Sequence, residues 1–230
     1  MLSTQAARYW HAATAVVVLV GFSVQLGLVI SGASVLTPDD PPSLADRLVH
    51  FFAYFTIQSN ILVCVAALAL ARRPDRDGPI WRVIRLDGLV GITVTGVIHW
   101  FFLRPLLHLE GWSYATDKIL HVVVPLMAVI GWVAYGPRFR ITARTVLAAT
   151  IWPIAYMIGV GIYGAITHWY AYPFIDVGVH GYAAIILTGV AILAFLLALA
   201  GIAGVVDRRL PSGRFEEPSP DPIRADSVSP

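Results

Sequence analysis

The stretch Tyr54–Asn60, with the sequence YFTIQSN, lies inside an apolar run that extends from Leu48 to Ala71. A membrane-spanning helix needs about 20 mostly apolar residues, and polar side chains inside it are costly unless they are paired or functional. Five of these seven residues carry polar side chains, which is more than helix packing normally requires. We therefore expect residues 48–71 to span a membrane and this stretch to form the wall of a site.

Helical spacing divides the polar residues of this stretch between two faces. Thr56 and Asn60 are four residues apart and share one face, with Ser59 beside them. Tyr54 and Gln58 form a second pair, rotated around the helix from the first.

Composition places the whole chain in the same class as this stretch. The protein has 230 residues, of which 57% are hydrophobic and 13% are charged, and its mean hydropathy is +0.73. Apolar blocks of this length exceed those of a soluble domain and predict an all-α, polytopic membrane protein. The single cysteine, Cys64, excludes an intrachain disulfide and a CxxC motif. The net charge of +2 says little by itself, because the distribution of charge carries the information in a membrane protein. We expect a membrane lipid or a lipid-ester substrate as partner and no nucleic acid.

Six apolar segments are expected to form a bundle of transmembrane helices over residues 1–206. They are, in chain order, about 12–30, 48–71, 86–103, 117–135, 143–167 and 179–206. Turn-forming, acidic or arginine-rich segments separate most of them, and an aromatic, lysine-free and arginine-free loop (168–174) precedes the last. Residues 207–230 are rich in proline, serine and charge, which predicts a disordered tail.

The distribution of basic residues predicts the orientation. Thirteen of the 16 Lys and Arg residues lie in the N-terminal segment, the tail and the loops after the second and fourth segments. Only Arg47, Arg104 and Lys118 lie on the other side, so the positive-inside rule predicts that both termini are cytoplasmic. The excess of arginine over lysine is typical of GC-rich bacterial genomes. We therefore expect a multi-pass protein of the bacterial cytoplasmic (inner) membrane.

Titratable side chains gather on the predicted outer side of the bundle. Six of the seven histidines fall there, and His99 and His121 are the two that lie deeper in the membrane. At 1.5 Å per residue, Thr56 should lie about 12 Å from the outer surface and His121 about 6 Å. Arg104 should lie in the outer third, where it would either face the site or extend to the surface.

Each of these residues also has a structural explanation. A membrane histidine such as His99 can bridge two helices by hydrogen bonds. The hydroxyl of Thr56 can bond the carbonyl four residues earlier. Tyr172 could belong to the belt of aromatic residues that lies at the membrane–water interface. Histidines on facing helices could hold a haem or a metal ion, but no same-helix ligand spacing is present, and we predict no metal and no cofactor.

Three segments in register resemble the androgen-induced membrane protein family, most closely its bacterial branch. They are Tyr54-Phe55-Thr56 in the second helix, Ile119-Leu120-His121 with the following Pro125 in the fourth, and the aromatic stretch Trp169–Phe174 before the sixth. Their order and spacing are similar over about residues 12–206. Characterised members of this family are six-helix threonine hydrolases that act on fatty-acid esters of hydroxy fatty acids.

The resemblance implies that Thr56 is a nucleophile and that His121 is its base. A hydroxyl becomes a good nucleophile when an adjacent base accepts its proton. We expect Gln58, Ser59 or Asn60 to stabilise the oxyanion. His99, Arg104 and Tyr172 complete the expected substrate-binding set. Residues 57–60 are more polar here than the animal members lead us to expect, which leaves the identity of the substrate open.

Two other functions use the same residues and remain open at this point. The first is a non-enzymatic protein that binds or transports a lipid or a small molecule in the outer cavity. The second is a membrane protein in which the outer histidines ligate haem or a metal. An optical spectrum distinguishes the haem protein, because it alone has a Soret band.

Overall fold

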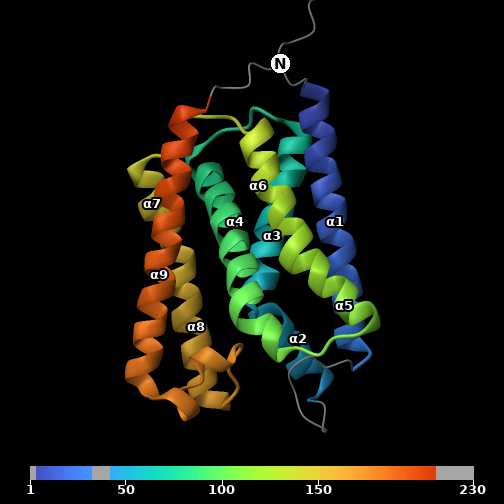
Figure 1. Ribbon diagram of the computed structural model, residues 1–230, viewed down its shortest axis with the longest axis vertical. Coiled ribbons are helices and arrows are strands. Elements are labelled where there is room, and N and C mark those ends of the chain that lie inside the picture. The colour runs from blue at the N-terminus through green and yellow to red at the C-terminus, as the bar shows by residue number, and fades with distance from the viewer. Residues whose placement is uncertain (1–3, 33–41, 211–230) are drawn as a thin grey trace, which may run out of the picture.

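Six long apolar helices make up most of the protein (Figure 1). The structure, a computed structural model, describes residues 4–32 and 42–210, and in these two ranges it contains helices and no strands. The candidate spans are Thr4–Ile30, Phe55–Arg72, Pro79–Leu106, Gly111–Tyr135, Ala143–Thr167 and Val177–Arg209. The prediction of an all-α, six-helix transmembrane bundle is confirmed.

The helices differ in how much of their surface the bundle covers. Helices α1 (Thr4–Ile30), α3 (Phe55–Arg72), α4 (Pro79–Ile98) and α6 (Val124–Tyr135) pack together, whereas α8 (Ile151–Thr167) and α9 (Val177–Arg209) form a pair beside them (Figure 1). In the most apolar window of α9 only 11% of the residues are buried, against 56% for the span that contains α4. Exposed apolar side chains on α9 therefore face the surroundings, as a lipid-facing helix requires.

The predicted second helix is broken in two at Tyr54. Helix α2 (Leu44–Ala53) ends there, Tyr54 is extended, and α3 begins at Phe55. Distant residues hold this break, because the Tyr156 hydroxyl donates to the carbonyl of Ala53 at 3.0 Å and the ring of Tyr54 lies 5.7 Å from that of Tyr172. Thr56 is consequently the second residue of α3 and lies near the start of a span rather than deep inside one.

Proline accounts for other differences from the predicted boundaries. Helix α4 begins at Pro79, inside the predicted loop, because proline is well tolerated in the first turn of a helix. The fifth predicted segment is interrupted at Thr150, between α7 (Ala143–Ala149) and α8, three residues before Pro153. At the C-terminus α9 continues to Arg209, and residues 211–230 of the predicted tail lie outside the described residues, as do residues 33–41.

Two π-helical turns bring histidines toward the centre of the bundle. They are η1 (His99–Leu103), which continues α4, and η3 (Ile119–Val123), which joins α5 (Gly111–Lys118) to α6. Pro125 cannot donate to the carbonyl of His121 four residues earlier, which favours the wider turn. Gly96 allows close approach, since a Cβ atom there would lie 3.2 Å from the His121 carbonyl oxygen.

Two short 3₁₀ helices complete the described structure. They are η2 (Arg104–Leu106), which follows η1, and η4 (Pro173–Ile175), which precedes α9. The aromatic loop before α9 does not stay at the surface. Its residues Ala171 and Ile175 are buried, and it packs against Tyr54 and Tyr156.

Candidate active site

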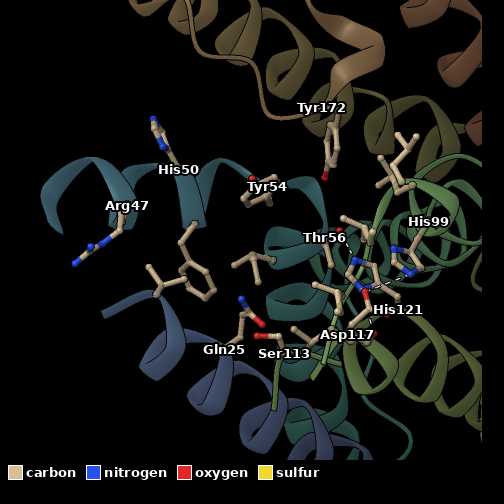
Figure 2. A pocket seen from close by; sticks show the side chains of 18 of the residues that line it. Gln25, Arg47, His50, Tyr54, Thr56, His99, Ser113, Asp117, His121 and Tyr172 are labelled. Atoms are coloured by element: carbon tan, nitrogen blue, oxygen red, sulfur yellow. Dashed lines mark hydrogen bonds and ion pairs between the residues drawn. The ribbon is translucent and has the colours of Figure 1, made fainter. Parts of the chain in front are cut away.

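Thr56, His121 and Asp117 lie in a row at the end of the bundle away from the described chain ends (Figures 1 and 2). The Oγ1 atom of Thr56 is 3.3 Å from Nε2 of His121. On the other side of the imidazole, Nδ1 is 3.1 Å from Oδ1 of Asp117. Thr56 comes from α3 and the other two from α5 and η3, where they are four residues apart. A hydroxyl, an imidazole and a carboxylate in this order are the parts of a nucleophilic triad.

The neighbours of His121 determine which ring nitrogen carries the hydrogen. Nδ1 is hydrogen-bonded to the backbone carbonyl of Asp117 at 3.1 Å and lies equally close to that residue's carboxylate. Both groups are acceptors when the carboxylate is ionised, so Nδ1 must be the protonated nitrogen. The lone pair of Nε2 then remains free to accept a proton from Thr56. The arrangement thus has the tautomer that a general base needs.

Two further side chains hold Asp117 and His121 in place. Lys118 pairs with Oδ2 of Asp117 at 2.8 Å, which offsets the charge of a carboxylate that is only 7% exposed. The ring of His99 stacks on that of His121, with centroids 3.9 Å apart and 17° between the planes. Nε2 of His99 is 3.3 Å from Oδ1 of Asp117, although its direction does not make a hydrogen bond. His99 is therefore a positioning residue that fixes the plane of the base.

His99, Asp117 and His121 also have the chemistry of metal ligands, with donor atoms that all lie within 4.8 Å of one another. An imidazole binds a metal through a lone pair that lies in the plane of its ring. Because the two rings are stacked at 3.9 Å and nearly parallel, an ion in the plane of one lies well outside the plane of the other. A shared ion would require one ring to rotate, and rotation of His121 would break its contact with Thr56. The arrangement fits a base and its support better than a metal site.

The three side chains predicted to stabilise the oxyanion point elsewhere. The amide of Gln58 donates to the carbonyl of Phe52 and accepts from Trp152. Ser59 is fully buried and does not line the cavity around Thr56. Asn60 donates to the carbonyls of Thr56 at 2.8 Å and Leu120 at 3.4 Å, so it ties α3 to η3. Gln58 and Asn60 thus hold segments of the bundle together, the Ser59 hydroxyl has no partner among the described residues, and none of the three lines the cavity around Thr56.

Other donors lie close to Thr56 instead. Since α3 starts at Phe55, the first N–H groups of this helix have no acceptor within the helix. The hydroxyl of Tyr172 lies against the backbone of Phe55 and Thr56 and beside the Thr56 side chain (Figure 2). Burial raises the pKa of Tyr172, while hydrogen bonds with Thr56 and Phe55 oppose the shift. Hydrogen bonds that lower the pKa of a phenol are donated to its oxygen, so Tyr172 accepts from the N–H groups of Phe55 and Thr56. Tyr172 therefore belongs to the site, not to a surface belt.

Arg104 is another predicted site residue that lies outside the cavities around Thr56. Its guanidinium lies 4.2 Å from the centre of the Trp100 ring, and both residues are exposed. It lines neither of the two large cavities. This position fits the alternative in which Arg104 extends toward the surface rather than facing the site.

Two cavities meet at Thr56. One has about 1150 Å³ of empty space, is partly open, and is lined by His99, Asp117 and His121 together with apolar residues of α1, α2 and η2. The other has about 1270 Å³ and is lined almost entirely by apolar residues of α4, α8 and α9. Thr56 and Tyr172 line both. A molecule with two apolar parts could thus lie on both sides of the Thr56 hydroxyl.

Asp117 is a site residue that the sequence analysis did not single out. It opens the predicted segment 117–135, and a carboxylate in the first turn of a helix suits the helix dipole. The signal that could have identified it is its spacing, because an acidic residue four positions before a histidine lies on the same helix face. In a membrane segment such a pair is costly unless it has a function.

Comparison of the chain with protein-family models, with curated proteins and with solved structures found no match. The geometry of the site is therefore the main guide to the function of this protein.

Proposed function

We propose that this protein is a membrane-embedded hydrolase of lipid esters that uses Thr56 as nucleophile and His121 as general base. The observation that carries the proposal is the row of contacts from Thr56 through His121 to Asp117. The cavities beside Thr56 supply the apolar surroundings that acyl chains require. The resemblance to threonine hydrolases of the androgen-induced membrane protein family agrees with this function.

The proposed reaction proceeds in two steps. The Thr56 oxygen attacks the ester carbonyl carbon while its proton passes to Nε2 of His121, and the imidazolium returns that proton to the departing alkoxide. Water then attacks the acyl-threonine ester with His121 again as base, which releases the acid and restores the hydroxyl. Asp117 accepts from Nδ1 throughout and stabilises the charged ring.

Charge that develops on the carbonyl oxygen needs donors close to Thr56. The first N–H groups of α3 donate to the Tyr172 oxygen beside Thr56. In the proposed reaction the substrate carbonyl oxygen takes the place of the Tyr172 oxygen as their acceptor. A helix N-terminus carries partial positive charge, which favours an oxyanion there. Preorganised donors of this kind contribute about 3–4 kcal/mol each to lowering the barrier.

The proposed location is the bacterial inner membrane with both termini in the cytoplasm. The asymmetry of the basic residues supports this orientation, and it puts Thr56 in the outer half of the bilayer. A lipid ester could then reach the site sideways, through the apolar cavity beside α9.

The proposal is tested by labelling the purified wild-type protein with a fluorophosphonate probe, digesting it and mapping the adduct by mass spectrometry. We expect modification of Thr56, and we expect lipid esters to compete with the probe. Ser113 lines the same cavity and serves as an internal control. A folded protein that is unlabelled, or labelled at Ser113 alone, would refute the assignment and favour the non-enzymatic lipid-binding alternative.

Filling the apolar cavity should affect long substrates selectively. A Cβ atom on Gly189, which lines this cavity, would lie 3.4 Å from Met157. At about 0.8 kcal/mol per buried CH₂, exclusion of two methylenes by Gly189→Leu should lower kcat/KM for a long-chain ester about tenfold. Cleavage of an acetyl ester should be unchanged.

The matched control for this prediction is Gly201→Leu in the same helix. Gly201 has open space around its Cα and does not line the cavity, so both variants gain the same helix propensity. Equal kcat/KM values for the long-chain ester in the two variants would show that the apolar cavity does not hold the acyl chain.

A further inference from the structure

A second polar cluster lies at the opposite end of the bundle, where the described chain begins and ends (Figure 1). It joins the start of α4 to the loop between α6 and α7 and to the end of α9. Its charged members are the four arginines and two aspartates Arg82, Arg85, Arg138, Arg140, Asp77 and Asp207. Guanidinium groups therefore outnumber carboxylates by two to one, which leaves excess positive charge.

Both aspartates accept hydrogen bonds from other groups, but Oδ1 of Asp207 is buried and has no hydrogen-bond partner among the described residues. Asp77 receives short contacts of 2.6 Å from both Arg82 and Arg140. Asp207 is fully buried, and its Oδ2 atom accepts from the backbone N–H groups of Arg140 at 2.7 Å and Ile141 at 3.1 Å. Neither carboxylate makes a hydrogen bond with Arg85 or Arg138 among the described residues.

Arg85 and Arg138 retain buried donors without partners. Arg138 is only 5% exposed and donates to the carbonyl of Val133, yet its Nε and Nη1 atoms have no acceptor in the described part of the chain. Arg85 donates to the carbonyl of Pro137 at 3.1 Å, whereas its Nη2 atom is buried and unpaired. A buried guanidinium with unmet donors is costly unless an anion completes it.

These unpaired donors converge on one point. A methyl group built on Gly136 would collide with Nη2 of Arg85 and would lie 3.4 Å from Nη1 of Arg138. A narrow cleft beside Arg85 is lined by Asp77 and Arg140 together with Trp81 and Trp132, whereas Arg138 lies outside its lining. Guanidinium groups match the geometry of phosphate oxygens and bind them through paired, charge-assisted hydrogen bonds.

We propose that Arg85 and Arg138 form a binding site for a phosphate group at the end of the bundle where the described part of the chain begins and ends. Basic pockets between helices at this level of a membrane are suited to the phosphodiester of an anionic lipid. Free inorganic phosphate offers the same oxygens, and the experiment separates the two sources. The inference is independent of the hydrolase proposal, because the site lies at the other end of the bundle.

The test measures the thermal unfolding of the purified wild-type protein under two sets of conditions. In one, the protein is in nanodiscs of phosphatidylcholine with or without phosphatidylglycerol. In the other, it is in phosphatidylcholine alone and is titrated with inorganic phosphate or with chloride at equal ionic strength. An increase in Tm with phosphatidylglycerol identifies the lipid as ligand, and an increase with phosphate but not chloride identifies the free ion. No increase under either condition overturns the proposal.

Two arginine variants separate a site from general attraction to anions. Arg85→Gln should weaken the response about tenfold, measured as the ligand concentration that gives half of the maximal Tm increase. Arg144→Gln removes the same charge from an exposed position at the same end of the bundle. It should change the half-maximal ligand concentration less than twofold. Equal effects would overturn the proposal. If Arg85→Gln does not fold, Arg85→Lys provides a second comparison. Lysine keeps the positive charge but lacks the paired N–H donors of the guanidinium group.

Discussion

Thr56→Ala is expected to abolish ester hydrolysis, lowering kcat by about 10⁴-fold or more, as loss of the nucleophile does in enzymes with a triad. The alanine variant keeps the backbone N–H groups at the start of α3, so substrate binding should persist. The measurement is hydrolysis of a chromogenic long-chain ester by protein in detergent, together with binding of a non-hydrolysable ether analogue. Loss of turnover with retained affinity would separate catalysis from simple lipid binding.

The matched controls for Thr56→Ala are Thr56→Ser and Ser113→Ala. Serine keeps the hydroxyl beside His121 and should retain turnover within about tenfold of wild type. Ser113 lines the same cavity but has no hydrogen bond to His121, and its removal should leave kcat unchanged. Full activity of Thr56→Ala would exclude the threonine mechanism.

The architecture could be predicted because the bilayer sets a simple length rule. Each predicted segment is an apolar run long enough to cross the hydrocarbon core, and each corresponds to a helix of the structure. The same rule fails inside the run 48–71, where the chain breaks at Tyr54. The contacts that hold this break come from Tyr156, Trp169 and Tyr172, about 100 residues away. Local composition carries no information about such contacts.

This break also explains why the expected depths did not match. Thr56 and His121 were expected about 6 Å apart in depth when Thr56 was counted from residue 48. With α3 starting at Phe55, Thr56 lies near the beginning of its span, at the level of η3. The structure brings the two side chains to 3.3 Å.

The role of individual polar residues was the part that sequence reasoning could not resolve. Residues 58–60 share a segment with Thr56, but a helix turns each side chain toward a different neighbour. Gln58 therefore meets Trp152, and Asn60 meets the carbonyl of Leu120. Tyr172 reaches Thr56 from a distant loop. Which donor faces a site depends on helix rotation and on loops that fold back, and both are set by tertiary packing.

Asp117→Asn is expected to lower kcat about 10²-fold. Asparagine has nearly the same shape, but its amide can turn its NH₂ group toward Nδ1 of His121. The ring would then favour the tautomer with hydrogen on Nε2, which cannot accept the Thr56 proton. In an isolated triad this change costs about 10⁴-fold. We expect a smaller loss here because the backbone carbonyl of Asp117 still accepts from Nδ1 at 3.1 Å.

The control for Asp117→Asn must separate orientation of His121 from general stability. Lys118→Gln removes the partner of Oδ2 and leaves Oδ1 beside His121, so it should lower kcat much less. Both variants should unfold within a few degrees of wild type. The pH–rate profile provides the second readout, because a wrong tautomer of His121 lowers kcat by the same factor at every pH. If Asp117→Asn retains full activity, the backbone carbonyl alone orients the base, and the site is a dyad of Thr56 and His121.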